Sequence, residues 1–396
     1  SNAIVIAVAS SGTAALLLNG GRTAHSTFKI PLDISSSTMC DITPRCDTAK
    51  LIQRAKLIIW DECSMVLPVI PGASRSAVVA QCLNRCYFWP QVTKSKLETN
   101  MRVLQALQSS NPDLANQLQL FSQYLLQIGE GKIDTVSLPG NIPSDFVPIP
   151  AEMHLRSSNL LDLLRAVFPD ISNSASDTQY FAGRVVLTPK NKDVSVINQL
   201  LLDCISGRKI TYYSNNQICD PQFRMHIPVE LLNAVESGSL PPHELILRIG
   251  APIILLRNLN PANGLCNGTR LIVRSLRNNT IEAIIITGPN AGDIVFIPRI
   301  KIITMAEPKN PYDFSRVQFP VRLAFAMTIN KAQGQTLSSV GLYLSSHVFA
   351  HGQFYVALFR VSTLSSIKIM IDSDISVLEN LPGHYTHNIV FSEVFR

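Results

Sequence analysis

The chain has 396 residues, 46% of them hydrophobic, so it can bury more than one large core, and its length favours two or three domains. Lys and Arg number 34 against 28 Asp and Glu, and the net charge of +6 suits a polyanionic partner without requiring one. There is no apolar run of about 18 residues and no basic leader, so we expect a protein that is neither membrane-spanning nor exported. The eight cysteines form no CxxC pair, which favours free thiols over zinc.

The N-terminal part predicts a strand–helix–strand unit. Residues 4–9 and 57–60 are short apolar runs, as expected of parallel strands that helices cover on both faces. Between them, TAALLL at 13–18 predicts a helix, and the order is that of a βαβ unit. Further helical patterns follow at 77–89, 113–131 and 157–170, the last two on either side of a Pro-rich loop.

A second α/β block begins at 184–205, where an apolar strand gives way to a helix that starts near Asn191. Residues 244–300 are alternating or apolar runs separated by turn sequences such as NPANG and PNAG. They predict a small β barrel or meander inserted into this block. Three later segments resume the α/β pattern: 319–337, 340–344 and 351–362.

An apolar run that ends in two carboxylates, KLIIWDECSM at 56–65, has the form of a Walker B element. In such an element Asp61 would hold Mg²⁺ and Glu62 would polarise the attacking water. A solvated strand end is the alternative interpretation of the same pair. The partner motif would be the phosphate-binding loop G-x-x-x-x-G-K-[ST], which the sequence lacks, because neither GGRT at 20–23 nor IGEGKID at 128–134 has its spacing and context.

Eight ordered blocks that span nearly the whole chain resemble one family, the Pif-one-like DNA helicases of superfamily one, and especially the copies carried by Helitron transposons. The blocks are ASSGTAALLLNGGRTAHSTFKIPLDI (9–34), KLIIWDECSM (56–65), LPVIPGASR (67–75), NMR (100–102), LTPKNKDVSVIN (187–198), LLRNLNPANGLCNGTRLIV (255–273), FPVRLAFAMTINKAQGQTL (319–337) and FYVALFRVS (354–362).

The resemblance implies an α/β fold with two RecA-like parallel-sheet lobes, the first of them incomplete, and a small SH3-like β domain inserted in the second. The expected division is a partial first lobe without the phosphate loop, a helical connecting region, a second lobe in two pieces and the inserted domain. Their ranges are 1–105, 106–180, 181–243 with 319–396, and 244–318, respectively.

The resemblance also assigns roles around bound ATP and Mg²⁺. Asp61, the metal ligand, and Glu62 would act in the nucleotide cleft, and Arg102 and Arg360 would stabilise the transition state at the γ-phosphate, as arginine fingers do. Gln333 and Gly334 would also line the cofactor site. DNA contacts would come from Ser11, Gly12, Thr23, His25, Thr188, Asn191, Lys331 and Thr336.

Several of these residues have an ordinary structural alternative. Thr188 precedes a proline at a common helix entry, Asn191 could be the N-cap of that helix, and His25 could be a packed core histidine. Arg102 and Arg360 would by default be surface charges. His347 and His351 lie four residues apart on a possible helix, but a metal site there is disfavoured because HVFAH lacks the glutamate of a zincin.

Three departures from the family bear on activity. The sequence starts just downstream of the expected phosphate-loop strand, and a helix and strand with the γ-phosphate-sensing glutamine are missing between Met65 and Val66. Phe359 stands where the family usually has serine before Arg360. We therefore expect an ATP-dependent 5′-to-3′ DNA helicase impaired in hydrolysis, acting on single-stranded DNA or DNA junctions.

Two alternatives remain open from the sequence: an inactive single-stranded nucleic-acid-binding module, and a decayed transposon product that does not fold stably. The family implies a nuclear location, with the mitochondrion as the other possibility. Oligomeric state does not follow from the sequence.

Overall fold

The structure, a computed structural model, divides into two compact units, which we call unit 1 (Ser1–Val167, Val186–Lys190 and Thr328–Arg396) and unit 2 (Phe168–Val185 and Asn191–Met327). The residues that it describes are 3–9, 12–16, 18–30, 40–61, 75–80, 82–85, 89–91, 93, 95, 99–109, 111–136, 145–157, 159–173, 177–223, 226–304, 312–372 and 383–395.

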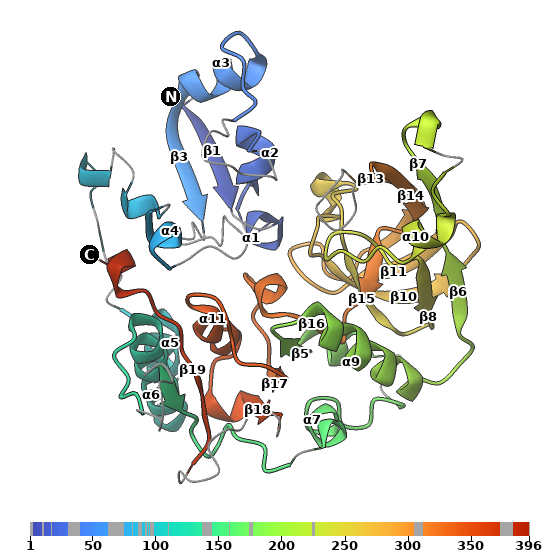
Figure 1. Ribbon diagram of the computed structural model, residues 1–396. Coiled ribbons are helices and arrows are strands. Elements are labelled where there is room, and N and C mark those ends of the chain that lie inside the picture. Colours follow the sequence, from blue (N-terminus) through green and yellow to red (C-terminus); the bar gives the residue numbers. More distant parts are fainter. Residues whose placement is uncertain are drawn as a thin grey trace. The chain divides into compact units, whose positions relative to one another are not determined.

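Unit 1 opens with a small parallel sheet of order β2-β1-β3, of which Figure 1 labels β1 and β3. The central strand β1 (Ile4–Ala9) pairs in parallel with β2 (Arg22–Thr23) and with β3 (Ala55–Asp61). The helix α1 (Gly12–Leu16) follows β1 directly, which confirms the predicted βαβ order. Ile6 and Val8 of β1 are buried and form a core with Ala24.

The expectation that residues 57–60 are covered on both faces is wrong. Leu57, Ile58, Ile59 and Trp60 are 51%, 45%, 42% and 41% exposed, although they belong to a seven-residue strand. The physical reason is that the described helices between β1 and β3 make their main contacts with β1 and β2 and not with β3, which is an edge strand of the described sheet. An apolar strand at a sheet edge is a liability that folded proteins normally cover or blunt.

The remaining helices of the N-terminal half are mostly short. The predicted helix over 77–89 is correct as far as Ala80, after which the described residues form 3-10 turns. The bounds are α2 (Ala24–Phe28), α3 (Asp47–Arg54), α4 (Arg75–Ala80), η1 (Leu83–Arg85), η2 (Trp89–Gln91), α5 (Met101–Gln108), α6 (Pro112–Glu130) and α7 (Leu160–Val167).

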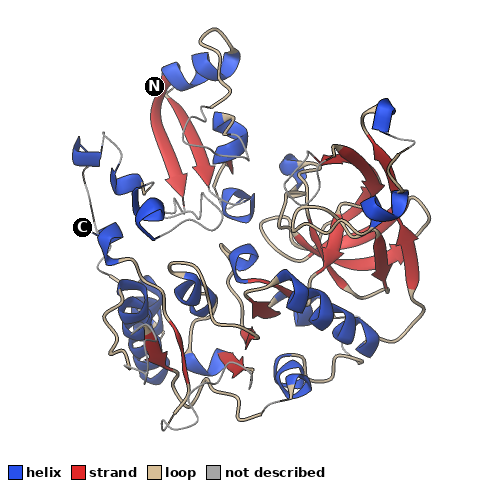
Figure 2. Cartoon of the chain, viewed as in Figure 1, coloured by secondary structure: helices blue, strands red, loops and turns tan. Residues whose placement is uncertain are grey.

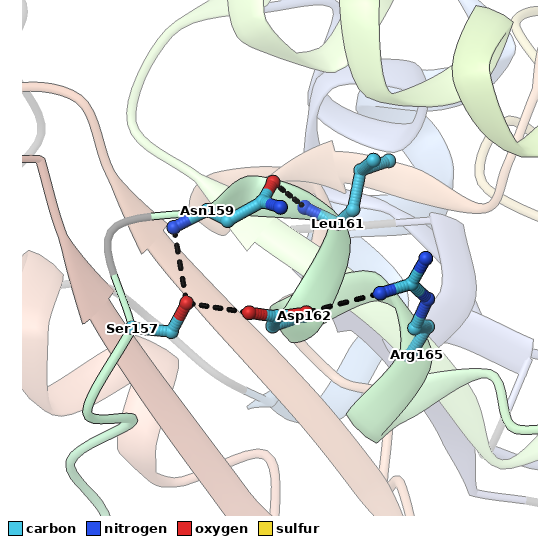
Figure 3. A network of polar contacts seen from close by, with 5 residues as sticks. All are labelled: Ser157, Asn159, Leu161, Asp162 and Arg165. Carbon is cyan, nitrogen blue, oxygen red and sulfur yellow. Dashed lines mark hydrogen bonds and ion pairs between the residues drawn. The ribbon is translucent and has the colours of Figure 1, made fainter.

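A network of polar contacts fixes the start of α7 (Figure 3). The Asn159 side chain accepts a hydrogen bond from Leu161 N at 3.0 Å, and Ser157 Oγ accepts from Asn159 N and donates to Asp162. Asp162 also pairs with Arg165 one turn later. Such side-chain acceptors satisfy N–H groups that the first helical turn leaves without partners.

A second set of parallel strands in unit 1 carries the C-terminal third of the chain. Strands β5 (Arg184–Thr188), β17 (Ser339–Leu344) and β18 (Ile367–Ile371) are neighbours in that order, and β17 and β18 pair in parallel. Helix α7 packs on β17 and β18, and a Cβ at Gly341 would come within 2.8 Å of Val167. Helix α11 (Gln353–Leu358) and the turns η5 (Ile329–Ala332), η6 (Leu364–Ser366) and η8 (Ser392–Phe395) complete this region.

Near its C-terminal end the chain pairs with the middle of the sequence. Strand β19 (Tyr385–His387) runs antiparallel to β4 (Phe146–Pro148), so that Thr386 lies opposite Val147 and both are fully buried. The long helix α6 contacts α11 nearby.

Unit 2 contains α9 (Asn191–Cys204) and an antiparallel sheet of order β12-β11-β10-β9-β15. Figure 2 draws all strands in red. In β11 (Thr280–Ile285) buried and partly exposed residues alternate, as expected of a sheet with one face on a core. The antiparallel meander is one of the two forms predicted for residues 244–300. The remaining strands, helices and turns between residues 178 and 328 are β6 (Ile210–Tyr213), β7 (Asn215–Ile218), β8 (Glu244–Leu247), β9 (Pro252–Leu255), β10 (Arg270–Leu276), β12 (Ile294–Pro298), β13 (Ile300–Thr304), β14 (Phe314–Gln318), β15 (Val321–Leu323), β16 (Ala326–Thr328), α8 (Thr178–Ala182), α10 (Val229–Asn233), η3 (Pro221–Phe223) and η4 (Pro261–Asn263).

In the part of the chain that the structure describes, no helix is both long and apolar enough to cross a bilayer. The cysteines described there, 40, 46, 82, 204, 219 and 266, are free thiols, as the sequence predicts.

Candidate nucleotide and DNA site

Asp61 is the last residue of β3 and lies opposite Ala9, the last residue of β1. On the other side of Ala9 the register places Thr23 of β2. Because the three strands are parallel, these residues share the carboxyl edge of the sheet, which is where open α/β sheets bind ligands. Gly12, the first residue of α1, follows β1 at the same edge. Glu62 and Ser11 lie outside the described residues.

Thr23 also begins α2, where its Oγ1 accepts a hydrogen bond from Ser26 N at 3.3 Å. His25 lies in the first turn of that helix and is half-buried, which leaves part of its ring accessible. The predicted DNA-contacting residues of this block that the structure describes, Gly12, Thr23 and His25, therefore lie at helix starts just after strands.

Arg102 is exposed and lies in the first turn of α5, which Asn100 caps by accepting from Arg102 N at 3.1 Å and from Val103 N at 3.4 Å. Its guanidinium donates through Nη1 to Ser362 Oγ at 3.4 Å. Ser362 is 260 residues further along the chain and only two residues after Arg360. The fold of unit 1 thus brings the two arginine-bearing segments together.

Arg360 is only 5% exposed, so the default expectation of a surface charge is wrong. Its Nε donates to Val356 O at 3.0 Å, and its Nη1 donates to Ala332 O and Gln335 O, both at 3.1 Å. Three backbone carbonyls therefore hold the guanidinium, as a buried charge requires. The arginine connects the end of α11 to the turn that contains Gln333 and Gly334.

That turn follows η5 and depends on Gly334, whose φ of 82° lies in the left-handed region that glycine adopts without strain. Lys331 and Gln333 flank it and are half-buried or nearly so, and Thr336 is exposed. Leu337 N donates to Arg360 O at 2.8 Å, so the exit of the turn is tied back to the arginine segment.

Thr188 ends β5 and is fully buried, so its hydroxyl is not exposed on the surface of the described structure. Asn191 is the first residue of α9 and is exposed. The sequence Thr188-Pro189 therefore marks a strand-to-helix turn, as its ordinary interpretation expects.

Histidine contacts were missed by the sequence analysis. His347 and His351 do not lie on a helix, since α11 begins at Gln353. Among the described residues no group of three or more His, Cys, Asp or Glu is placed to hold a metal. Instead His347 stacks on His387, with ring centroids 4.5 Å apart, and His154 stacks on His384 at 3.3 Å. Partners so far apart in the sequence leave no local signal.

Comparison with known proteins gives one consistent family. The family model for the PIF1-like helicase matches residues 1–67 and 64–138, and that for the 2B domain of the DNA helicase Pif1 matches residues 230–276. The first match falls in two pieces that meet at 64–67, where the sequence analysis expects missing elements. The ATP-dependent DNA helicase PIF6 of Trypanosoma brucei brucei is 34% identical over 128 residues, which is 32% of this chain and 16% of the relative.

Solved structures agree at the level of the fold. The match to Pif1 helicase from Candida albicans covers 92% of this chain and 83% of that one, with a TM-score of 0.54 and 19% identity. For the Bacteroides Pif1 helicase in complex with ADP-AlF3 and single-stranded DNA, the match covers 96% and 85%, with a TM-score of 0.50 and 22% identity.

The chain resembles the PIF1-like helicases, whose family models match residues 1–138 and 230–276. The mixed α/β fold with parallel sheets is that of the family's RecA-like structures. The chain spans 16% of the length of the trypanosome relative. The activity of a whole PIF1-like helicase is therefore not assigned to this chain by the match.

Proposed function

We propose that this chain is part of an ATP-dependent 5′-to-3′ DNA helicase. It would bind single-stranded DNA or DNA junctions and hydrolyse ATP slowly. The observation that carries the proposal is the convergence in unit 1 of Arg102, Arg360 and the turn at Gln333. These residues come from three distant stretches of sequence, yet Arg102 bonds to Ser362 and Arg360 bonds to the carbonyls on both sides of Gln333–Gly334. A motor needs such a connection to relate nucleotide state to movement.

In this proposal Asp61 is the metal ligand. A half-buried carboxylate at the carboxyl edge of a parallel sheet fits Mg²⁺, which takes one or two protein carboxylates and completes its shell with water and phosphate oxygens. The ion would neutralise charge that develops on the transferred phosphoryl group. Glu62 would orient the attacking water, and Gln333 and Gly334 would line the same nucleotide site.

Slow hydrolysis follows from what the 396 residues contain. They include no G-x-x-x-x-G-K-[ST] sequence, so the amide cradle and lysine that hold the phosphates have no counterpart in them. Losing one preorganised donor to a transition-state charge typically costs about 10²–10³ in rate. The arginines alone cannot restore that loss.

DNA binding is supported by the Bacteroides relative, which was solved with single-stranded DNA. Short polar side chains and helix starts suit phosphates, which are held without reading sequence. Because Thr188 is buried, it would support the turn before α9, whereas the exposed Asn191 would contact the DNA strand. The other residues that would contact the DNA, from the first block and from beside the turn, are Ser11, Gly12, Thr23, His25, Lys331 and Thr336.

The test is a titration of the full chain against a fluorescein-labelled oligo-dT at about 50 and 200 mM salt, beside phosphate release from ATP. We expect the affinity to fall about two- to threefold over this range for each phosphate that the protein neutralises, because bound counterions are released on binding. Phosphate release should be about 10² or more below that of a helicase that has its phosphate loop. Absence of any DNA binding at the lower salt concentration would refute the proposal.

An inactive single-stranded-DNA-binding module is the second candidate, and the missing phosphate-loop sequence favours it. The two differ in one measurement. Phosphate release that oligo-dT stimulates, and that Asp61→Asn abolishes, supports the slow ATPase; release indistinguishable from that of Asp61→Asn supports the inactive module.

A further inference from the structure

The last described segment, residues 383–395, which we call the C-terminal strap, ties together three distant parts of unit 1. Its strand β19 pairs with β4, Ile149 N donates to His384 O at 2.8 Å, and Asn388 N donates to Asp145 O at 2.8 Å. On its other side Gly352 N donates to Ile389 O at 2.9 Å.

The far end of the strap reaches the α4–η1 segment. Glu393 pairs with Arg75 at 2.7 Å, and Asn84 Nδ2 donates to the backbone oxygens of Glu393 and Val394, both at 3.1 Å. The side chain of Asn388 is buried and donates to Ile128 O, the carbonyl in the last turn of α6, at 2.8 Å. Release of the strap would therefore disconnect α4, α6 and β4 at once.

Three imidazole contacts fasten this strap. His154 stacks on His384 with centroids 3.3 Å apart and planes 10° apart, and His347 stacks on His387 at 4.5 Å and 7°. In the third contact His351 Nδ1 accepts the N–H of Phe391 at 2.8 Å.

Each contact is favoured by neutral imidazole. A protonated ring carries hydrogens on both nitrogens and cannot accept, so the bond between His351 and Phe391 breaks on protonation. Two stacked imidazolium rings repel at these separations, and one positive ring in a partly buried stack already loses hydration.

Charged groups around the strap mostly reinforce this preference. Arg156 faces the pair of His154 and His384, and Arg75 faces His351. Lys368 of β18 donates to the backbone oxygen of Glu152, close to His154 in sequence. The opposing acids are Asp145, which faces His387, and Glu393, which is already paired with Arg75.

We propose that the C-terminal strap is a pH-sensitive clasp: it is closed while the imidazoles of His154, His351 and His387 are neutral, and it opens when these three take up protons in mild acid. Opening separates β19 from β4 and frees Glu393 and Val394 from Arg75 and Asn84.

The direction of the titration agrees with the geometry. Burial, followed by His384 and Arg156, lowers the pKa of His154 to about 4, and burial likewise lowers the pKa of His351 and of His387. A base whose pKa is lower in the closed than in the open state stabilises the closed state above the open-state pKa, near 6.5. That stabilisation decreases progressively as pH falls from there toward 4.

The experiment is hydrogen–deuterium exchange on the full chain at about pH 7.5 and about pH 5.5, with rates corrected for intrinsic exchange. Protection of the amides of Ile149, Gly352, Asn388 and Phe391 should fall about tenfold or more at the lower pH, since the pKa difference at His154 alone accounts for about tenfold. The amides of β10 and β11 in unit 2 serve as the internal reference and should not change.

A matched variant separates titration from structure. In His154→Phe/His351→Asn/His387→Phe, phenyl rings keep the stacks on His384 and His347 and the Asn oxygen replaces Nδ1 as acceptor, so protection should match the wild type at the higher pH and no longer fall at the lower one. The single variant His351→Asn tests the Phe391 amide alone, and His226→Asn, on an exposed histidine of unit 2, should respond as the wild type does. Wild-type protection that is equal at both pH values, or a triple variant that still loses it, would overturn the proposal.

Discussion

Arg102 Nη1 and Ser362 Oγ are hydrogen-bonded at 3.4 Å, and two residues before that serine Arg360 is buried on three backbone carbonyls. The two arginines that the family pattern pairs in one role are thus in different physical states. One is exposed with a single contact to a side chain, and the other is part of the internal frame of unit 1. Substitution of the two arginines should therefore change the free energy of unfolding by different amounts.

Replacing Arg360 with Met should reduce the free energy of unfolding by about 3–5 kcal/mol, because Val356, Ala332 and Gln335 would each keep a buried carbonyl without its donor. Arg102→Met should cost less than about 1 kcal/mol, since an exposed charge and one long hydrogen bond contribute little. Urea denaturation of both variants checks this. Equal destabilisation would mean that Arg360 is not held in solution as the structure has it.

Much of the fold could be predicted from the sequence, because its periodicities are strong where tertiary context agrees with them. The strand and helix of 184–205 appear as β5 and α9, and the alternating runs of 244–300 appear as β8 to β13. These segments bury one face or both, so the pattern of apolar residues reports their structure directly.

The sequence could not show what distant contacts decide. The helix predicted over 77–89 ends at Ala80, and Asn84, in the turn that follows, bonds to Glu393 and Val394, about 310 residues away. Likewise the burial of Arg360 comes from carbonyls 25 and 28 residues earlier in the chain, and the histidine stacks join residues that no spacing connects. For the site, the family pattern named the residues, but only the folded structure distinguishes exposed from buried ones.

The exposed edge of β3 predicts an unusual tolerance to polar substitution. Ile58→Thr should change the free energy of unfolding by less than about 0.5 kcal/mol, because Ile58 is 45% exposed, and it should reduce light scattering at high protein concentration. Val8→Thr on the neighbouring strand, at a site with no exposure, should cost about 1–3 kcal/mol for the buried hydroxyl.

Both substitutions introduce a threonine hydroxyl and the two sites differ in burial, so thermal denaturation followed by circular dichroism compares the cost of that hydroxyl at each site. Destabilisation at Ile58 as large as that at Val8 would show that another part of the protein covers β3 in solution.

The packing of α7 on β17 predicts a steric effect at Gly341. An added methyl group would come within 2.8 Å of Val167 and 3.3 Å of Leu163, so Gly341→Ala should destabilise unit 1 by about 1–3 kcal/mol. Gly238→Ala is the control, because its nearest neighbour, Asn191, lies at 3.7 Å. Urea denaturation should separate the two variants, and a neutral Gly341→Ala would contradict the close approach of α7 to the strand.

In unit 2 a single strand offers the sharpest comparison between a buried and an exposed arginine. Arg270 in β10 is fully buried, and burial lowers its pKa to about 10, well above neutral pH, so it remains charged. It donates to the carbonyls of Phe181, Ala182, Arg184 and Ala324 at 2.9–3.3 Å. Those bonds replace the water that the guanidinium and the end of α8 would otherwise need.

Arg270→Met should therefore cost about 3–5 kcal/mol, since four carbonyls lose their donor inside the protein. Arg274→Met, four residues further along β10, removes an exposed guanidinium whose ion pair with Glu282 is long, at 3.7 Å, and should cost less than about 0.5 kcal/mol. Unfolding of both variants in guanidinium chloride measures the two losses of stability. Raising salt should not reproduce the Arg270 effect, because screening acts on exposed pairs and not on a charge that only buried carbonyls hold.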